Sequence, residues 1–180
     1  KVEIEPIAGK LRPLCMLEQG QVTVIKGIAI SSHLKERRVS ERMREACLKA
    51  LNKAGYEADI EVINDKSAYQ KGAALFAYSL TDKGCLLGSD MAGKLGRTAE
   101  EIGKKVARSL IEDIDSGATV DRFTADQLIL YAALADGESE YIIPRMTEHV
   151  DSNLWLVEEI LGAEVSLDNR KLKIRGVGLQ

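Results

Sequence analysis

The chain contains only two imidazole side chains, His33 and His149, and imidazole is the group best suited to nucleophilic and acid–base chemistry near neutral pH. His149 stands in residues 145–153 (RMTEHVDSN), directly before the first turn of a predicted helix. A helix start offers unpaired N–H groups and a partial positive charge, which attract phosphate and favour the neutral, nucleophilic form of a nearby imidazole. From spacing alone, a loop histidine that makes a capping contact fits equally well. His33 falls at the end of a predicted strand beside charged residues and is interpreted as an exposed or packing side chain.

The acidic residues and cysteines of the chain do not indicate a metal-binding or catalytic site. The acidic pairs Glu100-Glu101 and Glu158-Glu159 have helix-face spacing and are interpreted as solvated charge. The cysteines are odd in number, widely spaced and not in CxxC pairs, so neither a disulfide framework nor a zinc site is indicated and a reducing cytoplasm is expected. They are Cys15, Cys47 and Cys85.

The composition, 45% hydrophobic, is that of a globular chain with a core. The net charge of −3 and the pI near 5.6 argue against a protein that coats nucleic acid along its whole surface, but they are compatible with a local RNA site. No apolar run approaches the roughly 20 residues that span a bilayer, and no signal peptide is recognised, so no membrane association is expected. Residues 1–6 (KVEIEP) alternate like a strand already under way, without an initiating Met, and indicate a fragment.

Alternating strands and helices are expected to position these residues. Val- and Ile-rich or alternating segments predict strands at residues 22–30, 58–63, 73–80, 85–89 and 139–143. The turn signal at residues 168–170 (DNR) predicts a hairpin of strands 164–168 and 171–175. The expected fold class is α+β, with helix pairs laid on one face of small sheets.

Two helices are predicted before residue 117. The first covers residues 40–54, where apolar side chains recur at helical spacing. The second begins at a capping box of Thr98 and Glu101 and ends near residue 116. Ion pairs of Glu100 with Lys104 and of Glu101 with Lys105 are expected to support it.

Two further helices are predicted after residue 117. A second capping box, of Thr124 and Gln127, is expected to begin a helix that runs to residue 135 and is apolar on nearly every side, so we expect it to be buried. Asp151 or Ser152 is expected to cap the last helix, which ends at Leu161.

Three motifs in order resemble the C-terminal signature of RNA 3′-terminal phosphate cyclases. Shorter matches upstream extend the resemblance over nearly the whole chain. Residues 67–72 (SAYQKG) depart from a stretch that is often glycine-rich in the family, and Asp151-Ser152 replaces a pair that is commonly threonine-rich. The three motifs are residues 117–128 (GATVDRFTADQL), 132–135 (AALA) and 147–155 (TEHVDSNLW), and the upstream matches are 9–14 (GKLRPL), 20–27 (GQVTVIKG), 39–43 (VSERM) and 96–103 (GRTAEEIG).

The resemblance implies an ATP-dependent reaction on RNA that ends in a 3′-terminal phosphate. A histidine at the position of His149 attacks the α-phosphate of ATP, releases pyrophosphate and holds AMP through a phosphoramidate bond. The AMP passes to the RNA 3′-phosphate, and the neighbouring 2′-hydroxyl attacks that phosphate to give a 2′,3′-cyclic end and free AMP. Adenylation is needed because a phosphate monoester has no good leaving group.

The resemblance also implies nucleotide contacts from Phe123, Asp126 and Gln127. Asp126 and Gln127 match residues that line the nucleotide site, and Phe123 matches a position against the adenine. Each has an alternative interpretation: Gln127 as the capping-box partner, Asp126 as a helix-start charge, and Phe123 as core. Mg²⁺ is expected because the charge of a pyrophosphate leaving group must be neutralised, and its ligands are not identified in this chain.

Cyclases share a core of repeated units, each two helices on a four-stranded sheet, interrupted by a smaller inserted domain. By resemblance, residues 1–13 close one core unit, residues 14–117 form the inserted domain, and residues 118–180 build part of the last core unit. The final helix, Trp155 included, is then expected to be mostly core rather than to offer a base-stacking platform. The missing N-terminal half supplies most contacts to the triphosphate, the metal and the RNA, so this piece alone is expected to be inactive.

Two other functions stay open. Cyclase-like proteins without catalysis serve as ribosome-biogenesis factors in eukaryotes, but they lack the nucleophilic histidine, so His149 argues against this function. A bare RNA-binding module should carry a basic stripe or paired surface aromatics, and neither is evident in a chain with 4% aromatic residues.

Overall fold

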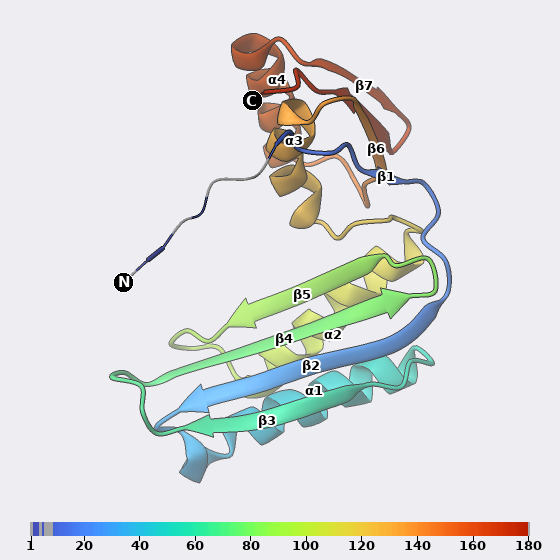
Figure 1. Cartoon of the computed structure of the whole chain (residues 1–180). Coiled ribbons are helices and arrows are strands. Elements are labelled where there is room, and N and C mark those ends of the chain that lie inside the picture. The colour runs from blue at the N-terminus through green and yellow to red at the C-terminus, as the bar shows by residue number, and fades with distance from the viewer. Residues whose placement is uncertain (1, 4, 6–8, 180) are drawn as a thin grey trace. The chain divides into compact units, whose positions relative to one another are not determined.

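The computed structural model describes residues 2, 3, 5 and 9–179, which form two compact units (Figure 1). The central unit is residues 18–117, and the flanking unit combines the residues up to 17 with those from 118 onward. The described residues hold four α-helices and two four-stranded mixed sheets, which confirms the predicted α+β class.

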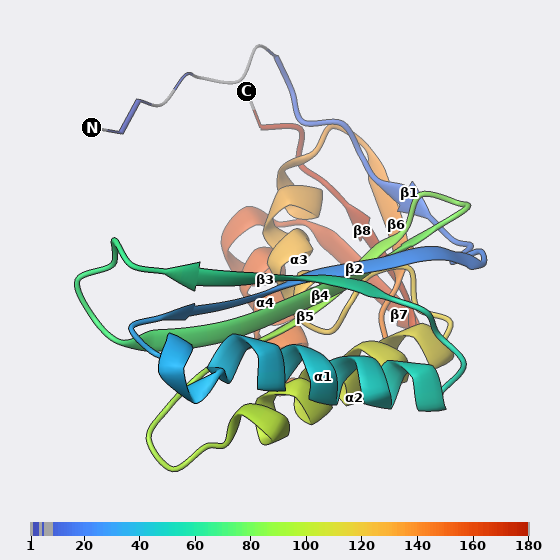
Figure 2. The same cartoon turned by 90° about the horizontal axis from the view of Figure 1, so that it is seen from below.

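The central unit is a four-stranded sheet with two helices on one face (Figure 2). The strand order is β3-β2-β4-β5, with β2 and β3 parallel and the other neighbours antiparallel. Its elements are β2 (Val22–Ser32), the 3-10 helix η1 (Lys35–Arg37), α1 (Val39–Lys53), β3 (Asp59–Asp65), β4 (Gly72–Thr81), β5 (Leu86–Ala92) and α2 (Ala99–Asp115).

The helices α1 and α2 come into backbone contact at Gly103. A Cβ atom on Gly103 would collide with the carbonyl oxygen of Met43, and it would lie 2.8 Å from the Cβ of Ala46 and 2.9 Å from the main-chain nitrogen of Cys47. Real Cβ atoms do not approach other atoms this closely. Glycine is therefore what allows the two helices to pack at this distance.

The start of α2 confirms the predicted capping box but not the predicted ion pairs. Thr98 caps the helix, its Oγ1 accepts from the Glu101 N–H at 3.2 Å, and the Glu101 carboxylate accepts from the Thr98 N–H at 2.7 Å. The carboxylate of Glu100 accepts two hydrogen bonds from Arg42 of α1, at 2.7 and 2.8 Å. The carboxylates make these hydrogen bonds rather than close ion pairs with Lys104 and Lys105. Of the two predicted pairs, only Glu100 with Lys104 has an electrostatic effect, since the charge of Lys104 helps to lower the pKa of the Glu100 carboxyl.

The flanking unit is also a four-stranded sheet with two helices. The strand order is β1-β6-β8-β7, with β1 and β6 parallel and the other neighbours antiparallel. Asn169 lies in the left-handed region (φ 56°) between the two strands of the predicted hairpin, which is confirmed. The elements are β1 (Cys15–Met16), α3 (Thr124–Leu134), β6 (Glu138–Ile142), α4 (Glu148–Leu161), β7 (Glu164–Asp168) and β8 (Lys171–Arg175).

Burial in the flanking unit is more one-sided than the sequence predicts. In α3, Ile129 is fully buried, but Leu130 is 51% exposed and Tyr131 is 58% exposed, so the prediction of a helix buried all round is wrong. In α4, Leu154 is buried and Trp155 is 62% exposed, so the prediction that Trp155 is core is also wrong. In this unit each helix buries the face turned to the sheet and to its neighbouring helix, and the opposite face is left open.

The boundary between the units differs slightly from the predicted one. Cys15 and Met16 pair with β6 and belong to the flanking unit, whereas the inserted domain was expected to begin at residue 14. Of the expected first strand at residues 1–6, the described residues Val2, Glu3 and Glu5 are not in a strand, and the others lie outside the described residues.

Candidate active site

His149 is the second residue of α4 and its side chain is exposed. The helix begins four to five residues earlier than predicted, because Thr147 rather than Asp151 or Ser152 caps it. The Oγ1 of Thr147 accepts a hydrogen bond from the Val150 N–H at 3.2 Å. His149 therefore lies inside the first turn, where the N–H groups have no partner within the helix.

The start of α3 is capped by Asp121, not by the predicted box of Thr124 and Gln127. One carboxylate oxygen of Asp121 accepts from the N–H groups of Phe123, at 2.9 Å, and Thr124, at 2.7 Å, and the other accepts from Thr124 Oγ1 at 3.0 Å. Asp121 competes successfully because its side chain reaches two N–H groups and one hydroxyl at the helix start. The exposed Gln127 side chain takes no part in this cap.

Phe123 and Asp126 are also available to a ligand. The Phe123 ring is 49% exposed, so the alternative interpretation of Phe123 as a core residue does not hold. Asp126 is half-buried in the first turn of α3. Its negative charge and, more strongly, burial raise the pKa of Tyr141, whose hydroxyl donates to the main-chain oxygen of Ala125 at 3.2 Å. The Asp126 carboxylate thus lies near a buried phenol that stays protonated.

A hydrogen bond joins α3 and α4 beside these residues. The amide of Asn153 donates to the main-chain oxygen of Asp126 at 3.4 Å. Because His149 and Asn153 are four residues apart, they lie on the same side of α4. The imidazole is therefore on the side of α4 that carries the contact to the start of α3, where Phe123, Asp126 and Gln127 are found.

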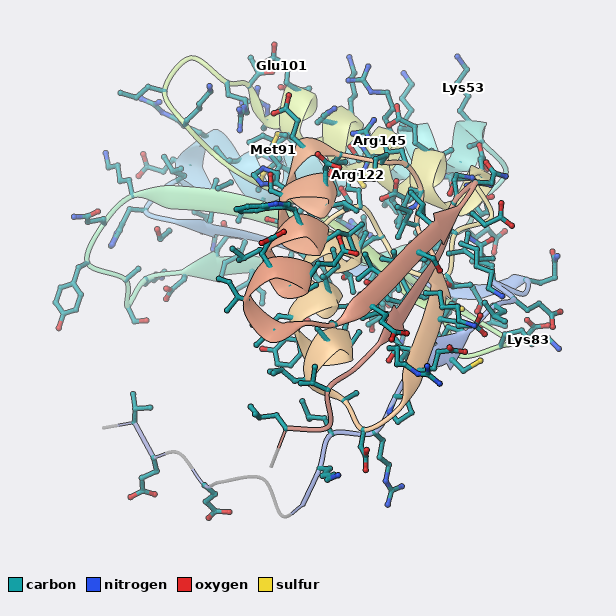
Figure 3. The ribbon with its side chains drawn as sticks, turned by 90° about the horizontal axis from the view of Figure 1, so that it is seen from above. Lys53, Lys83, Met91, Glu101, Arg122 and Arg145 are labelled. Carbon is teal, nitrogen blue, oxygen red and sulfur yellow. The ribbon has the colours of Figure 1, made fainter. Side chains whose placement is uncertain are left out.

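The charges around His149 are mixed. Glu148 and Asp151 occupy the first turn of α4, which stabilises the helix but counteracts its attraction for phosphate. Arg145, exposed in the loop before α4 and labelled in Figure 3, is a cation that the sequence reasoning did not select.

His33 has a different environment. It is exposed, directly follows β2, and adopts the left-handed backbone conformation (φ 54°). Its Nε2 lies 2.6 Å from the main-chain oxygen of Ala68 in the β3–β4 loop. The interpretation as a surface histidine therefore agrees with its position.

No metal centre is apparent in the described part of the chain, where no three His, Cys, Asp or Glu side chains gather as ligands. Within the same residues, no helix has the length and apolar character needed to cross a bilayer.

A pair of aromatic side chains on β4 was missed at the sequence level. Phe76 and Tyr78 project from the sheet face opposite α1 and α2, and their rings stack with centroids 5.6 Å apart and planes at 22°. The period of two residues in a strand places them on one face, and this spacing was the available signal.

Comparison with known proteins gives the family. The family model described as "RNA 3′-terminal phosphate cyclase (RTC), insert domain" matches residues 17–115, which is more than half of the chain and nearly all of the central unit.

The chain belongs to the RNA 3′-terminal phosphate cyclase family.

Relatives named RNA 3′-terminal phosphate cyclase match both units. The protein from Pyrobaculum neutrophilum is 33% identical over 98% of this chain and 52% of its own length. The protein from Pyrobaculum aerophilum is 31% identical over 98% of this chain and 51% of its own length. The protein from Saccharolobus islandicus is 29% identical over 95% of this chain and 50% of its own length. The chain thus spans about half the length of the curated cyclases that it matches, in agreement with the resemblance to a C-terminal portion.

Proposed function

We propose that this chain is the nucleophile-bearing part of an ATP-dependent enzyme that converts an RNA 3′-terminal phosphate to a 2′,3′-cyclic phosphate. The observation that supports this most directly is the position of His149: an exposed imidazole in the first turn of α4, on the side that is bonded to the start of α3. The names of the relatives support the reaction class.

In the first step, an imidazole nitrogen of His149 attacks the α-phosphorus of ATP. A P–N bond forms, the bond from the α-phosphorus to the bridging oxygen breaks, and pyrophosphate leaves. Phe123 is proposed to stack on the adenine, and Asp126 and Gln127 are proposed to hydrogen-bond the nucleoside. The exposure of the Phe123 ring and the absence of Gln127 from the helix cap leave both side chains available for these roles.

In the second and third steps the AMP moves to RNA and is released. A 3′-phosphate oxygen attacks the adenylate, the P–N bond to His149 breaks, and the ribose 2′-hydroxyl then attacks the 3′-phosphorus with AMP as leaving group. No side chain of the chain is assigned to the 2′-hydroxyl proton. We propose that the segment present in the longer relatives supplies the remaining contacts, and that this piece alone does not turn over.

Mg²⁺ remains part of the proposal as a neutralising charge for the leaving pyrophosphate. Its ligands are not identified among the described residues, and no step is routed through it. A reducing cytoplasm is the proposed compartment, supported by three free cysteines, Cys15, Cys47 and Cys85.

The test uses the full-length protein that contains this chain. It is mixed with α-labelled ATP, and we expect acid-labile, base-stable label on the protein. His149→Asn should abolish the label. His33→Asn is the matched control, because it removes the other imidazole at a position whose left-handed backbone suits Asn, and it should label normally.

Label retained by His149→Asn would show that the nucleophile is another residue. Formation of a cyclic phosphate on RNA with a 3′-phosphate separates the enzyme from a scaffold, since RNA that is bound but unchanged supports the non-catalytic alternative. For the adenine contact, Phe123→Ala should raise the ATP concentration needed for labelling, and an unchanged requirement would exclude stacking.

A further inference from the structure

A basic groove lies on the central unit, and none of the residues assigned to the reaction lines it. It has a volume of about 650 Å³ and is bounded by the edge strand β5, the loop that follows it and the outer face of α2. Met91 of β5 and Glu101 of α2, both labelled in Figure 3, are among its lining residues. We call it the α2 groove. Its charged lining is five cations, Lys94, Arg97, Lys104, Lys105 and Arg108, against a single carboxylate, Glu101.

The one carboxylate of the groove is already engaged. Glu101 accepts hydrogen bonds from the N–H and the hydroxyl of Thr98, at 2.7 and 3.0 Å, and these bonds lower the pKa of the Glu101 carboxyl. The neighbouring Glu100 turns to α1, where Arg42 binds both of its oxygens. Both carboxylates therefore form their hydrogen bonds away from the groove lysines, and the charge of Lys104 acts on them only at longer range, where it helps to lower their pKa values.

The lysines of the groove consequently have no ion-pair partner. Within the described residues, no carboxylate oxygen lies within 4.0 Å of the ammonium groups of Lys94, Lys104 or Lys105. Lys104 and Arg108 are also four residues apart on one helix face, where like charges are mutually destabilising. Arg108 has a carboxylate within reach, Glu112 at 3.9 Å, but the lining as a whole keeps an excess of positive charge. Such an excess is the arrangement expected of an anion-binding surface.

The shape of the cationic surface fits a polyanion rather than a single ion. From Ala99, the first residue of α2, to Arg108 the rise along the helix is about 14 Å, at 1.5 Å per residue, and Arg97 and Lys94 precede the helix. A second groove shares Lys94 and Arg97 with the first and adds Arg37 and Lys71, so the cations continue around the start of α2. Such a length suits several successive phosphates.

We propose that the α2 groove binds the sugar-phosphate backbone of single-stranded RNA without reading its sequence. The inference rests on the proposed function only in taking RNA as the natural polyanion of this family. Met91, half-buried, and Leu95, fully exposed in the loop, both line the groove and offer apolar surface to sugars and base faces. Contact along the backbone would hold the RNA at a point distinct from its reactive 3′-terminal phosphate.

The experiment measures binding of a 5′-fluorescein-labelled 12-nucleotide RNA to the 180-residue chain by fluorescence anisotropy, with no ATP present. The variant is Lys104→Ala/Lys105→Ala. If each lysine meets one phosphate, the slope of log K against log salt should become less steep by about 1.4, and binding at 0.15 M salt should weaken about tenfold. RNAs with a 3′-phosphate and a 3′-hydroxyl should bind alike.

A matched control removes the same charge at the other end of the central unit. Lys53→Ala/Lys83→Ala takes one lysine from the last turn of α1 and one from the β4–β5 turn, and Figure 3 shows both away from Glu101. It should bind RNA like the parent chain. Equal weakening in both double variants would overturn the site, since the effect would then come from net charge alone.

Two further outcomes would overturn the inference. One is parent-like binding and salt slope in Lys104→Ala/Lys105→Ala. The other is a polyglutamate peptide that displaces the RNA at equal charge concentration, which would point to an acidic protein partner. Failure of the proposed function looks different: His149→Asn would still carry label, or no label would form at all, while RNA binding to the α2 groove would be unaffected.

Discussion

Gly103→Ala should destabilise the central unit although alanine is the better helix former. Replacement of a helix-interior glycine by alanine normally gains about 1 kcal/mol. Here the added methyl group meets the backbone of α1, the carbonyl oxygen of Met43 and the nitrogen of Cys47, as well as the side chain of Ala46. Backbone atoms cannot rotate away, so the two helices must separate.

The size of the effect follows from these opposing terms. Overpacking a close contact costs about 1–3 kcal/mol of stability. Because the added methyl group would meet main-chain atoms of α1, we expect a cost near the upper end of that range. When the gain in helix propensity is subtracted, the free energy of unfolding should fall by roughly 2 kcal/mol. In a unit of this size, that loss corresponds to a fall in Tm of roughly 8–16 °C.

The assay is thermal unfolding by circular dichroism together with hydrogen–deuterium exchange of α1 and α2, which separates the central unit from the flanking unit. Lys104→Gly, at an exposed position of the same helix, measures the effect of helix propensity without a packing change, and it should lower the free energy of unfolding by about 1 kcal/mol. A Tm that rises in Gly103→Ala would refute the packing argument, because it would mean that the helices adjust without loss.

Three more outcomes are expected. Thr147→Ala should cost about 1 kcal/mol at the start of α4 and speed amide exchange there about fivefold, whereas Thr147→Ser should retain protection. At pH 8, Cys15 should react with a thiol reagent and Cys47 should not, because burial raises the pKa of the Cys47 thiol to about 12; equal reactivity before unfolding would contradict this. Hydrogen bonds from Arg42 lower the pKa of the Glu100 carboxyl, so their stabilisation is present above the unfolded value near 4.3 and is lost as the pH falls through the folded pKa. Arg42→Gln should therefore be less stable than the parent at pH 7, with a gap that closes below about pH 4.

Strong local signals predicted much of the fold. The capping box of Thr98 and Glu101 and the turn at residues 168–170 both specify their structure through contacts within a few residues, and both predictions are confirmed. The errors arise where local signals compete. Three residues upstream of Thr124, Asp121 offers an ionised acceptor, and the sequence alone does not rank the two.

Distant contacts account for the other errors. Glu100 has a lysine four residues away, yet it binds Arg42, 58 residues earlier in the chain, because packing of α1 against α2 brings the two side chains together. For the same reason, helical spacing could not show that Lys104 and Lys105 have no carboxylate within 4.0 Å among the described residues.

The candidate active site was predicted residue by residue from motifs, and the structure adds their environment. His149, Phe123 and Gln127 are exposed and Asp126 is half-buried. What the sequence could not supply is the bond from Asn153 to Asp126, since the relation between α3 and α4 depends on how both pack on the sheet. Their roles in nucleotide binding stay predictions.

The pairing of β1 with β6 has a consequence for synthesis of the protein. The N–H of Leu14 donates to the hydroxyl of Ser139, 125 residues later, so this edge of the flanking sheet cannot form until that much more chain has been made. At 5–20 residues per second, the wait is roughly 6–25 seconds. The central unit is contiguous, and its two ends are already joined by the bond from Gln19 to the main-chain oxygen of Ile114. It can therefore fold on the ribosome first, and the flanking sheet forms only after the central unit is complete.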